Sequence, residues 1–117
     1  MIPILHRKHV LVASIQSALT DADWMKLSAD LSSQIGELRA RAVVLDLTLM
    51  DVMDSFATRV LRTLAQTMTL RGAQTILVGI QPDVAIAMVQ LGLAQRLDGI
   101  LTALNLEHGL DMAEALV

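Results

Sequence analysis

The sequence predicts an α/β fold built on a mixed, mainly parallel β-sheet. Two buried-type apolar runs, residues 42–47 and 74–80, are each followed by a segment of helical periodicity. Alternating strands and helices joined by short loops need crossover connections, which make neighbouring strands parallel. Two apolar runs around a polar turn open the chain and add an antiparallel strand. We therefore expect the order ββαβαβαβα, with four helices.

The first third of the chain predicts a hairpin and a helix. Residues 2–5 and 10–15 are apolar, and residues 6–9 between them read His-Arg-Lys-His, which predicts a solvated turn. Thr20 and Asp23 have the spacing of a helix-capping box. Apolar residues then recur at steps of three and four, which predicts an amphipathic helix ending between residues 36 and 41: Trp24, Leu27, Leu31, Ile35 and Leu38.

The middle of the chain predicts two buried strands, each followed by a helix. Residues 42–47 are apolar except for Asp46, which is typical of a strand covered on both faces. A polar loop at 48–54 leads to a helix over 55–71, with Gly72 as its C-terminal cap. After the strand at 74–80, Pro82 opens a third helix that stops at Gly92.

The end of the chain predicts one more strand and helix, and the third helix is unusually apolar. A weak strand at 100–103 precedes a last helix at 107–116. Apolar side chains surround most of the third helix, namely Val84, Ile86, Met88, Val89 and Leu91. Either one face covers the sheet and another meets a partner, or the whole helix is buried by its own neighbours.

Length and composition limit the classes of protein to consider. The 117 residues suit one domain, 1–117. Hydrophobic residues make up 54% of the chain and charged residues 18%. So small a domain cannot bury all of these hydrophobic side chains, so we expect self-association or a partner surface. No apolar run is long enough to span a membrane. The N-terminus lacks a secretory signal pattern and the chain has no Cys, which predicts a cytoplasmic protein. A net charge of −3 gives no reason to expect nucleic acid as a partner.

The candidate site lies where the strand at 42–47 feeds into the second helix. Asp46, Thr48, Asp51, Asp54 and Ser55 gather there, and open α/β sheets place their sites at such carboxyl ends. Asp54 can cap the helix while Ser55 occupies its first turn. A phosphate on Ser55 would face backbone N–H groups and the positive end of the helix dipole, yet Asp51 and Asp54 would repel it. The site has the features of a switch, although a simple helix cap would have the same residues.

Other chemistries find less support in the sequence. Asp46, Asp51 and Asp54 could hold magnesium, which is a second reading of the same loop. His6, His9 and His108 have no Cys to complete a zinc site and are expected at the surface. A hydrolase using Ser55 with Asp46 or His108 lacks the Gly-x-Ser-x-Gly elbow, and no phosphate-binding glycine loop is present. We expect a protein that is not an enzyme and needs no cofactor or metal.

Four segments together resemble the STAS domains of bacterial sigma-factor control, the anti-anti-sigma family. They are residues 43–48, 54–56, 72–73 and 79–85, and the resemblance covers nearly the whole chain. Within the family the chain is most similar to the stressosome antagonists, which are small stand-alone STAS proteins. Phe56 and Ala57 replace the second Ser and the Gly that simple anti-anti-sigma factors carry. The sensory co-antagonists of the stressosome generally have Thr at the position of Ser55 and a separate N-terminal domain.

The resemblance implies a non-enzymatic scaffold of the stressosome that controls a stress response. Such a protein assembles with itself and with sensory STAS co-antagonists, and it sequesters a switch serine/threonine kinase until that kinase phosphorylates Ser55. The surface that binds the partner would include Thr48, Asp51, Asp54, Phe56 and Arg59. The alternative is a structural STAS subunit of a lipid-transport complex that is never phosphorylated and docks through its third helix.

Overall fold

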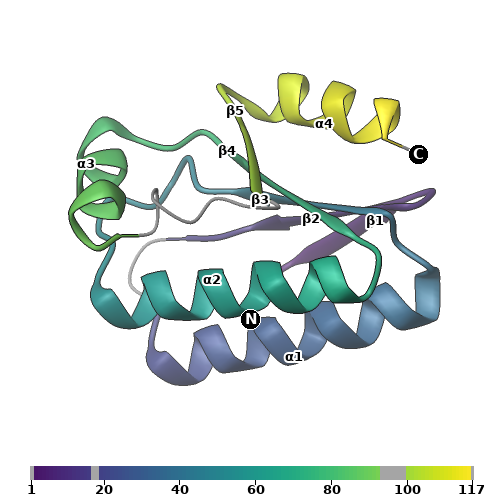
Figure 1. Ribbon diagram of the computed structural model, residues 1–117, viewed down its shortest axis with the longest axis horizontal. Helices are drawn as coiled ribbons and strands as arrows, with labels where there is room; N and C mark the ends of the chain where they lie inside the picture. Colours follow the sequence, from purple (N-terminus) through teal and green to yellow (C-terminus); the bar gives the residue numbers. More distant parts are fainter. Residues whose placement is uncertain (1, 17–18, 93–99, 117) are drawn as a thin grey trace.

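The computed structural model describes residues 2–16, 19–92 and 100–116. At its centre is a five-stranded sheet with the order β1-β2-β3-β4-β5 (Figure 1). Strand β1 pairs antiparallel with β2, and each following pair is parallel. The mixed, mainly parallel sheet predicted from the sequence is confirmed. The strands are Ile4–Arg7 (β1), Val10–Ser14 (β2), Ala42–Asp46 (β3), Gln74–Val78 (β4) and Ile100–Ala103 (β5).

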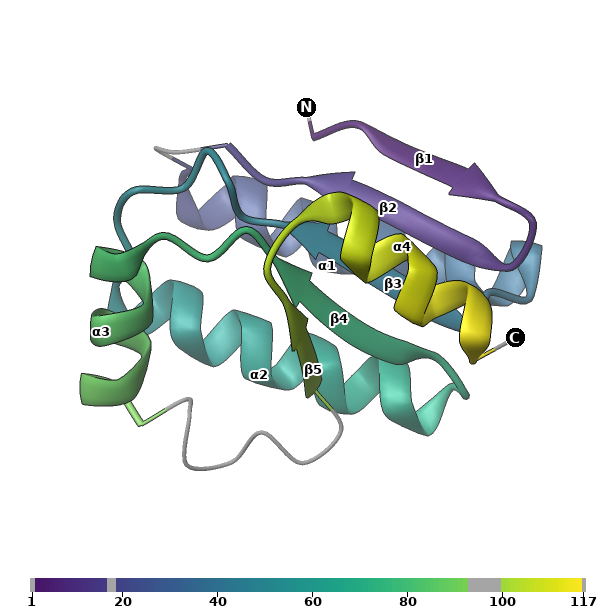
Figure 2. The same cartoon turned by 90° about the horizontal axis from the view of Figure 1, so that it is seen from above.

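Helices cover both faces of the sheet. Helices α1 and α2 lie side by side on one face and α4 lies on the other, while α3 stands beyond the carboxyl ends of the parallel strands (Figures 1 and 2). The predicted order ββαβαβαβα is confirmed. None of the described helices combines the length and hydropathy needed to cross a bilayer. The helices are Asp21–Leu38 (α1), Ser55–Leu70 (α2), Pro82–Gln90 (α3) and Leu106–Ala115 (α4).

Strand β3 lies at the centre of two hydrophobic layers. Val43 and Leu45 belong to the large core under α1 and α2, whereas Ala42 and Val44 belong to the smaller core under α4. All four side chains are fully buried, which confirms a strand covered on both faces. Gly109 lets α4 approach the sheet closely, because a Cβ there would collide with the side chain of Val78.

Helix α1 has the cap that the sequence predicts. The backbone N–H of Asp23 donates to Thr20 Oγ1 over 3.1 Å, and the backbone N–H of Thr20 donates to Asp23 Oδ2 over 3.0 Å. The second bond favours the charged carboxylate and lowers the pKa of Asp23. At the other end Arg39 adopts a left-handed conformation (φ 52°) and its N–H donates to the Ile35 carbonyl. Four of the expected apolar residues are buried: Trp24, Leu27, Leu31 and Ile35.

The opening hairpin and several element ends differ from the prediction by one or two residues. Strand β1 covers Ile4–Arg7 instead of residues 2–5, because Lys8 turns at φ 55° and Arg7 pairs with Val10, leaving a two-residue turn. The predicted solvated segment 6–9 is exposed, but its first half is strand. The predicted strand 74–80 ends two residues earlier because Gly79 turns the chain at φ 69°. Helix α4 begins one residue earlier than predicted, after an Asn105 cap.

Candidate functional site

The candidate site lies at the carboxyl ends of β3 and β4. The segment 47–54 leaves β3 and leads to α2, while residues 79–81 leave β4 and lead to α3 (Figure 2). Parallel strands bring these two loops to the same edge of the sheet. We call segment 48–54 the switch loop. The sequence predicted the site at this edge but did not predict that the two loops touch.

Ser55 is the first residue of α2 and its side chain is exposed. Asp54 is the N-cap: its Oδ1 accepts a 2.7 Å hydrogen bond from the Ala57 N–H, and its carbonyl accepts bonds from the Thr58 N–H and hydroxyl. These bonds satisfy the third and fourth N–H groups of the helix, whereas those of Ser55 and Phe56 bond to no described residue. The predicted arrangement of cap and first-turn serine is therefore confirmed.

The Ser55 hydroxyl makes no hydrogen bond to any described residue. A nucleophilic serine needs a base within hydrogen-bond reach, and neither Asp46 nor His108 bonds to it in the described part of the chain. His108 is exposed, as are His6 and His9, which places all three at the surface as expected. An exposed hydroxyl at a helix N-terminus suits a phosphoacceptor better than an activated nucleophile.

Two methionines anchor the switch loop in the core. Met50 is 2% exposed and Met53 is 6% exposed, so the loop is fixed at two points three residues apart. The residues between and beside them point outward, with Leu49 at 61% and Val52 at 71% exposure. Asp51 and Thr48 are also exposed. The sequence reading treated this segment as polar and missed both its anchors and its exposed apolar side chains, although the Met-x-x-Met spacing was a usable signal.

Asp46 holds the start of the switch loop. Its Oδ1 accepts hydrogen bonds from the Thr48 N–H (3.0 Å) and the Thr48 hydroxyl (2.6 Å). The carboxylate is thus bonded to the backbone and side chain of its own loop. Among the described residues no three metal-binding side chains gather, so Asp46, Asp51 and Asp54 do not form the magnesium cluster considered above.

The switch loop is joined directly to the loop that precedes α3. The Gln81 side-chain amide donates a 2.6 Å hydrogen bond to the Thr48 carbonyl. Gly79 lies against the same residue, because a Cβ at Gly79 would collide with the Thr48 hydroxyl. Only glycine combines this close approach with a φ of 69°. The two loops form one surface, which was not predictable from residues 33 positions apart.

Helix α3 presents an apolar face beside the switch loop. Val84 and Met88 are buried in the core, while Ile86 is 57% exposed and Val89 is 58% exposed. The reading in which the whole helix is buried by its neighbours is therefore wrong, because one face packs inward and another is open; that a partner covers the open face stays a prediction. We call Leu49, Val52, Ile86 and Val89 the apolar switch face.

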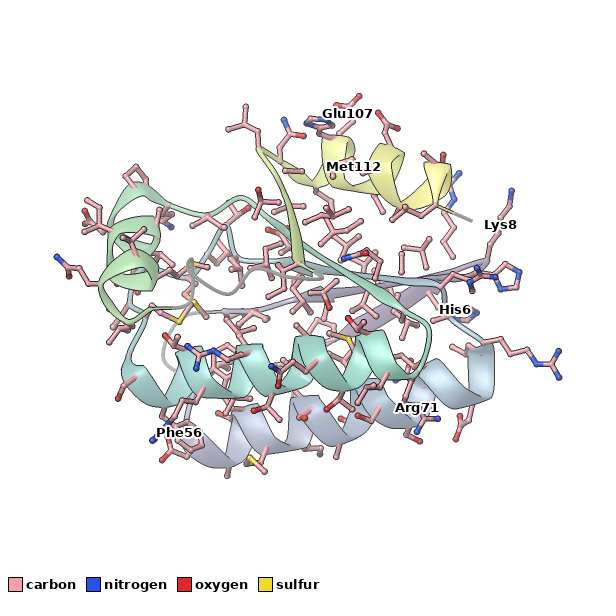
Figure 3. All side chains as sticks on the ribbon, viewed as in Figure 1. His6, Lys8, Phe56, Arg71, Glu107 and Met112 are labelled. Carbon is pink, nitrogen blue, oxygen red and sulfur yellow. The ribbon has the colours of Figure 1, made fainter. Side chains whose placement is uncertain are left out.

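The other two predicted site residues lie on α2. Phe56 is half-buried and packs against the core near the start of α2, where this helix lies beside α1 (Figure 3). Only part of its ring is open to a partner. Arg59 is exposed one turn after Ser55, at the i+4 position on the same side of the helix. The structure therefore brings Ser55, Asp54 and Arg59 to one end of α2 and places Phe56 largely in the core.

Comparison with known proteins gives one family and a group of close structural neighbours. The model of the STAS domain family matches residues 1–108. A structure of RsbS from Moorella thermoacetica, with a serine replaced by glutamate, is 34% identical, has a TM-score of 0.86, and aligns over 98% of this chain and 96% of that one. A chain from the stressosome, described as a signal integration and transduction hub, is 35% identical with a TM-score of 0.81, over 97% of each chain.

More distant structures share the fold alone. The Bacillus cell fate determinant SpoIIAA in its phosphorylated form has a TM-score of 0.72 at 15% identity, over 96% of this chain and 98% of that one. A search among curated proteins found no match. The two neighbours above 30% identity align from end to end, so the likeness includes the switch loop and the start of α2.

Proposed function

This chain belongs to the STAS domain family, and we propose that it acts as a stressosome antagonist: a scaffold that holds a switch serine/threonine kinase and releases it when Ser55 is phosphorylated. Its likeness to RsbS and to the stressosome chain, at 34% and 35% identity, supports this placement within the family. By the same likeness we propose a cytoplasmic protein that assembles with itself and with sensory STAS co-antagonists.

The observation that carries the proposal is the exposed, unbonded hydroxyl of Ser55 at the N-terminus of α2. A kinase must reach the serine and align its hydroxyl with the γ-phosphate, which an exposed first-turn residue allows. The N–H groups of Ser55 and Phe56 can donate hydrogen bonds to the phosphate oxygens once the group is transferred. The serine can therefore be modified without unfolding α2.

Phosphorylation would change the charge of the surface around Ser55. The new group carries about −1.5 to −2 charge at neutral pH, and Asp51 and Asp54 already make this loop acidic. Arg59 is the cation on the same side of α2 and can offset part of that charge. In a kinase bound across the loop, the new phosphate would place a double negative charge beside the apolar contacts of the interface. That combination favours release.

The apolar switch face is the surface we assign to the partner. Leu49 and Val52 on the loop and Ile86 and Val89 on α3 are more than half exposed, and the hydrogen bond from Gln81 to Thr48 joins the two segments. Exposed aliphatic side chains beside a charged rim are typical of protein-binding surfaces. Thr48, Asp51, Asp54 and Arg59 supply the charged and polar rim, and Phe56 supports it from within.

The test is a binding assay with the purified kinase and three variants of the chain. We expect Ser55→Ala to stay bound in the presence of ATP, Ser55→Glu to bind weakly, and wild type to be released as it is phosphorylated. Ser33→Ala is the matched control, because Ser33 is an exposed helical serine on α1 far from the loop. Equal binding by Ser55→Glu and wild type would contradict the proposal.

A second candidate function rests on the apolar face of α3. A structural subunit of a lipid-transport complex would dock through Ile86 and Val89 and would not depend on Ser55. Substituting Ile86 and Val89 by Ser would then abolish partner binding while Ser55→Glu had no effect. The switch proposal expects both changes to weaken binding, so this pair of variants separates the two functions.

A further inference from the structure

The second feature of interest is a pocket at the opposite edge of the sheet from Ser55. Here the ends of α1 and α2 meet the start of β3 and border an open surface hollow of about 370 Å³. Arg39 comes from the end of α1, Arg41 precedes β3 and Arg71 ends α2. Figure 3 shows Arg71 where the last turns of the two helices come together. The volume lies within the range of small-ligand sites, roughly 300–1,000 Å³.

All three arginine side chains are exposed to solvent. Within the described part of the chain none of them makes a hydrogen bond or an ion pair, and no carboxylate lines the pocket. Each guanidinium offers five N–H donors in a planar fork that matches the oxygens of a phosphate. Such a concentration of positive charge stands out in a chain whose net charge is −3.

Helix capping explains only part of this arrangement. A cation at the carboxyl end of a helix is favoured by the helix dipole, which accounts for Arg39 and Arg71 one by one. It does not account for Arg41, which lies outside both helices. The two helix ends contribute about −0.5 charge each, so three arginines leave a net charge of about +2 in the pocket. The pocket therefore still attracts an anion.

Gly36 is the residue that makes room for Arg71. It lies in the last turns of α1, where glycine weakens the helix by about 1 kcal/mol relative to alanine. A Cβ at this position would lie 2.5 Å from Arg71 Nη2. The Arg71 guanidinium thus occupies space that a side chain at Gly36 would need, and both residues line the pocket together with Arg39 and Arg41.

We propose that this pocket binds the phosphate group of a small molecule, either inorganic phosphate or the phosphates of a nucleotide. Phosphate is favoured over a carboxylate ligand because three separate forks can each engage a different pair of its oxygens. The site is distinct from Ser55, since it lies at the amino ends of the strands and the switch loop lies at their carboxyl ends.

The test is an NMR titration of the full chain at constant ionic strength, first with inorganic phosphate and then with a nucleoside triphosphate. We expect saturating shifts of the amides of Gly36, Arg41 and Gly72 with at least one of these ligands. If inorganic phosphate saturates the shifts, the free anion is enough for binding. If only the nucleotide saturates them, the ligand is a nucleotide. Shifts that fail to saturate with both would overturn the proposal.

Variants assign the binding to the pocket. We expect Arg71→Gln to raise the dissociation constant about tenfold or more, because one charge-assisted bidentate contact is lost. Gly36→Ala should also weaken binding, although it favours the helix. Lys26→Gln removes one exposed charge near the other end of α1 and should leave affinity unchanged. Equal losses of affinity in Arg71→Gln and Lys26→Gln would show that only the net charge of the chain matters, and would contradict the proposed site. Ser55→Ala should bind the anion normally, which keeps this result separate from that of the kinase switch.

Discussion

The Gln81 side-chain amide donates a 2.6 Å hydrogen bond to the Thr48 carbonyl, and this bond joins the loop after β3 to the loop after β4. The two residues are 33 positions apart, yet together they determine how the apolar side chains on the switch loop lie relative to those on α3. A partner that contacts both segments therefore depends on this hydrogen bond.

Removing the Gln81 amide should loosen the switch loop. We expect Gln81→Ala to cost about 0.5–1.5 kcal/mol, the usual worth of one such bond, and to speed hydrogen exchange of the amides at 49–52. Gln90→Ala is the matched control, since Gln90 is exposed at the far end of α3. Unchanged exchange in the loop of Gln81→Ala would show that the bond does not hold it.

Gly79 should tolerate substitution less well than Gly92. Both have a positive φ, 69° and 83°, so alanine is strained by about 1–2 kcal/mol at either position. Only at Gly79 would the new Cβ also collide with Thr48, whereas no described residue lies within 4 Å of a Cβ at Gly92. Urea denaturation should show a clearly larger loss for Gly79→Ala. Equal losses would mean that Thr48 moves away at no cost.

The methionine anchors predict a separation between stability and binding. Met50→Ala removes a buried side chain and should lower the free energy of unfolding by about 2–5 kcal/mol. Leu49→Ala changes an exposed side chain next to it and should change stability by less than about 0.5 kcal/mol. Kinase binding should fall in Leu49→Ala despite its native stability. A fully stable Leu49→Ala protein with full binding would remove Leu49 from the partner surface.

The cap of α2 can be separated from its charge. Asp54→Ala loses the bond to the Ala57 N–H and should destabilise the protein by about 1 kcal/mol. Asp54→Asn keeps a capping oxygen, so its unfolding midpoint in urea should stay close to wild type. An Asn variant as unstable as the Ala variant would show that the negative charge, and not the hydrogen bond, stabilises the helix.

The capping box of α1 predicts a pH dependence. The hydrogen bond from the Thr20 backbone holds the pKa of Asp23 below its ordinary value in the folded protein. A lowered folded pKa adds stability that is present above the unfolded pKa and is lost as the pH falls through the folded one. Wild type should therefore exceed Asp23→Asn in stability at pH 6, and this advantage should shrink toward pH 3. A constant difference across that range would contradict the account.

Sequence periodicity was enough for the architecture because the strands and helices here are strongly patterned. The continuous apolar run of β3 is typical of a strand buried on both faces, and the spacing of apolar residues from Trp24 to Ile35 is that of an amphipathic helix. Both predictions are confirmed. The turn predicted at residues 6–9 proved to be only Lys8 and His9, because a left-handed lysine has no sequence mark, unlike the Asn-Gly or Asp-Gly pairs of most two-residue turns.

The site was predictable in its local parts and not in its tertiary ones. Asp54 capping next to Ser55 follows from residue types four or fewer positions apart. The Gln81 to Thr48 bond and the convergence of Arg39, Arg41 and Arg71 depend on how β3, β4 and two helix ends meet in space. No pattern within one segment contains that information.

The most direct test of the central claim is peptide mapping by mass spectrometry after the chain is incubated with ATP and the switch kinase, with complex formation followed in the same sample. We expect one phosphate, on Ser55, and loss of the complex in proportion to its occupancy. A phosphate on another residue, or full phosphorylation of Ser55 with the complex intact, would contradict it.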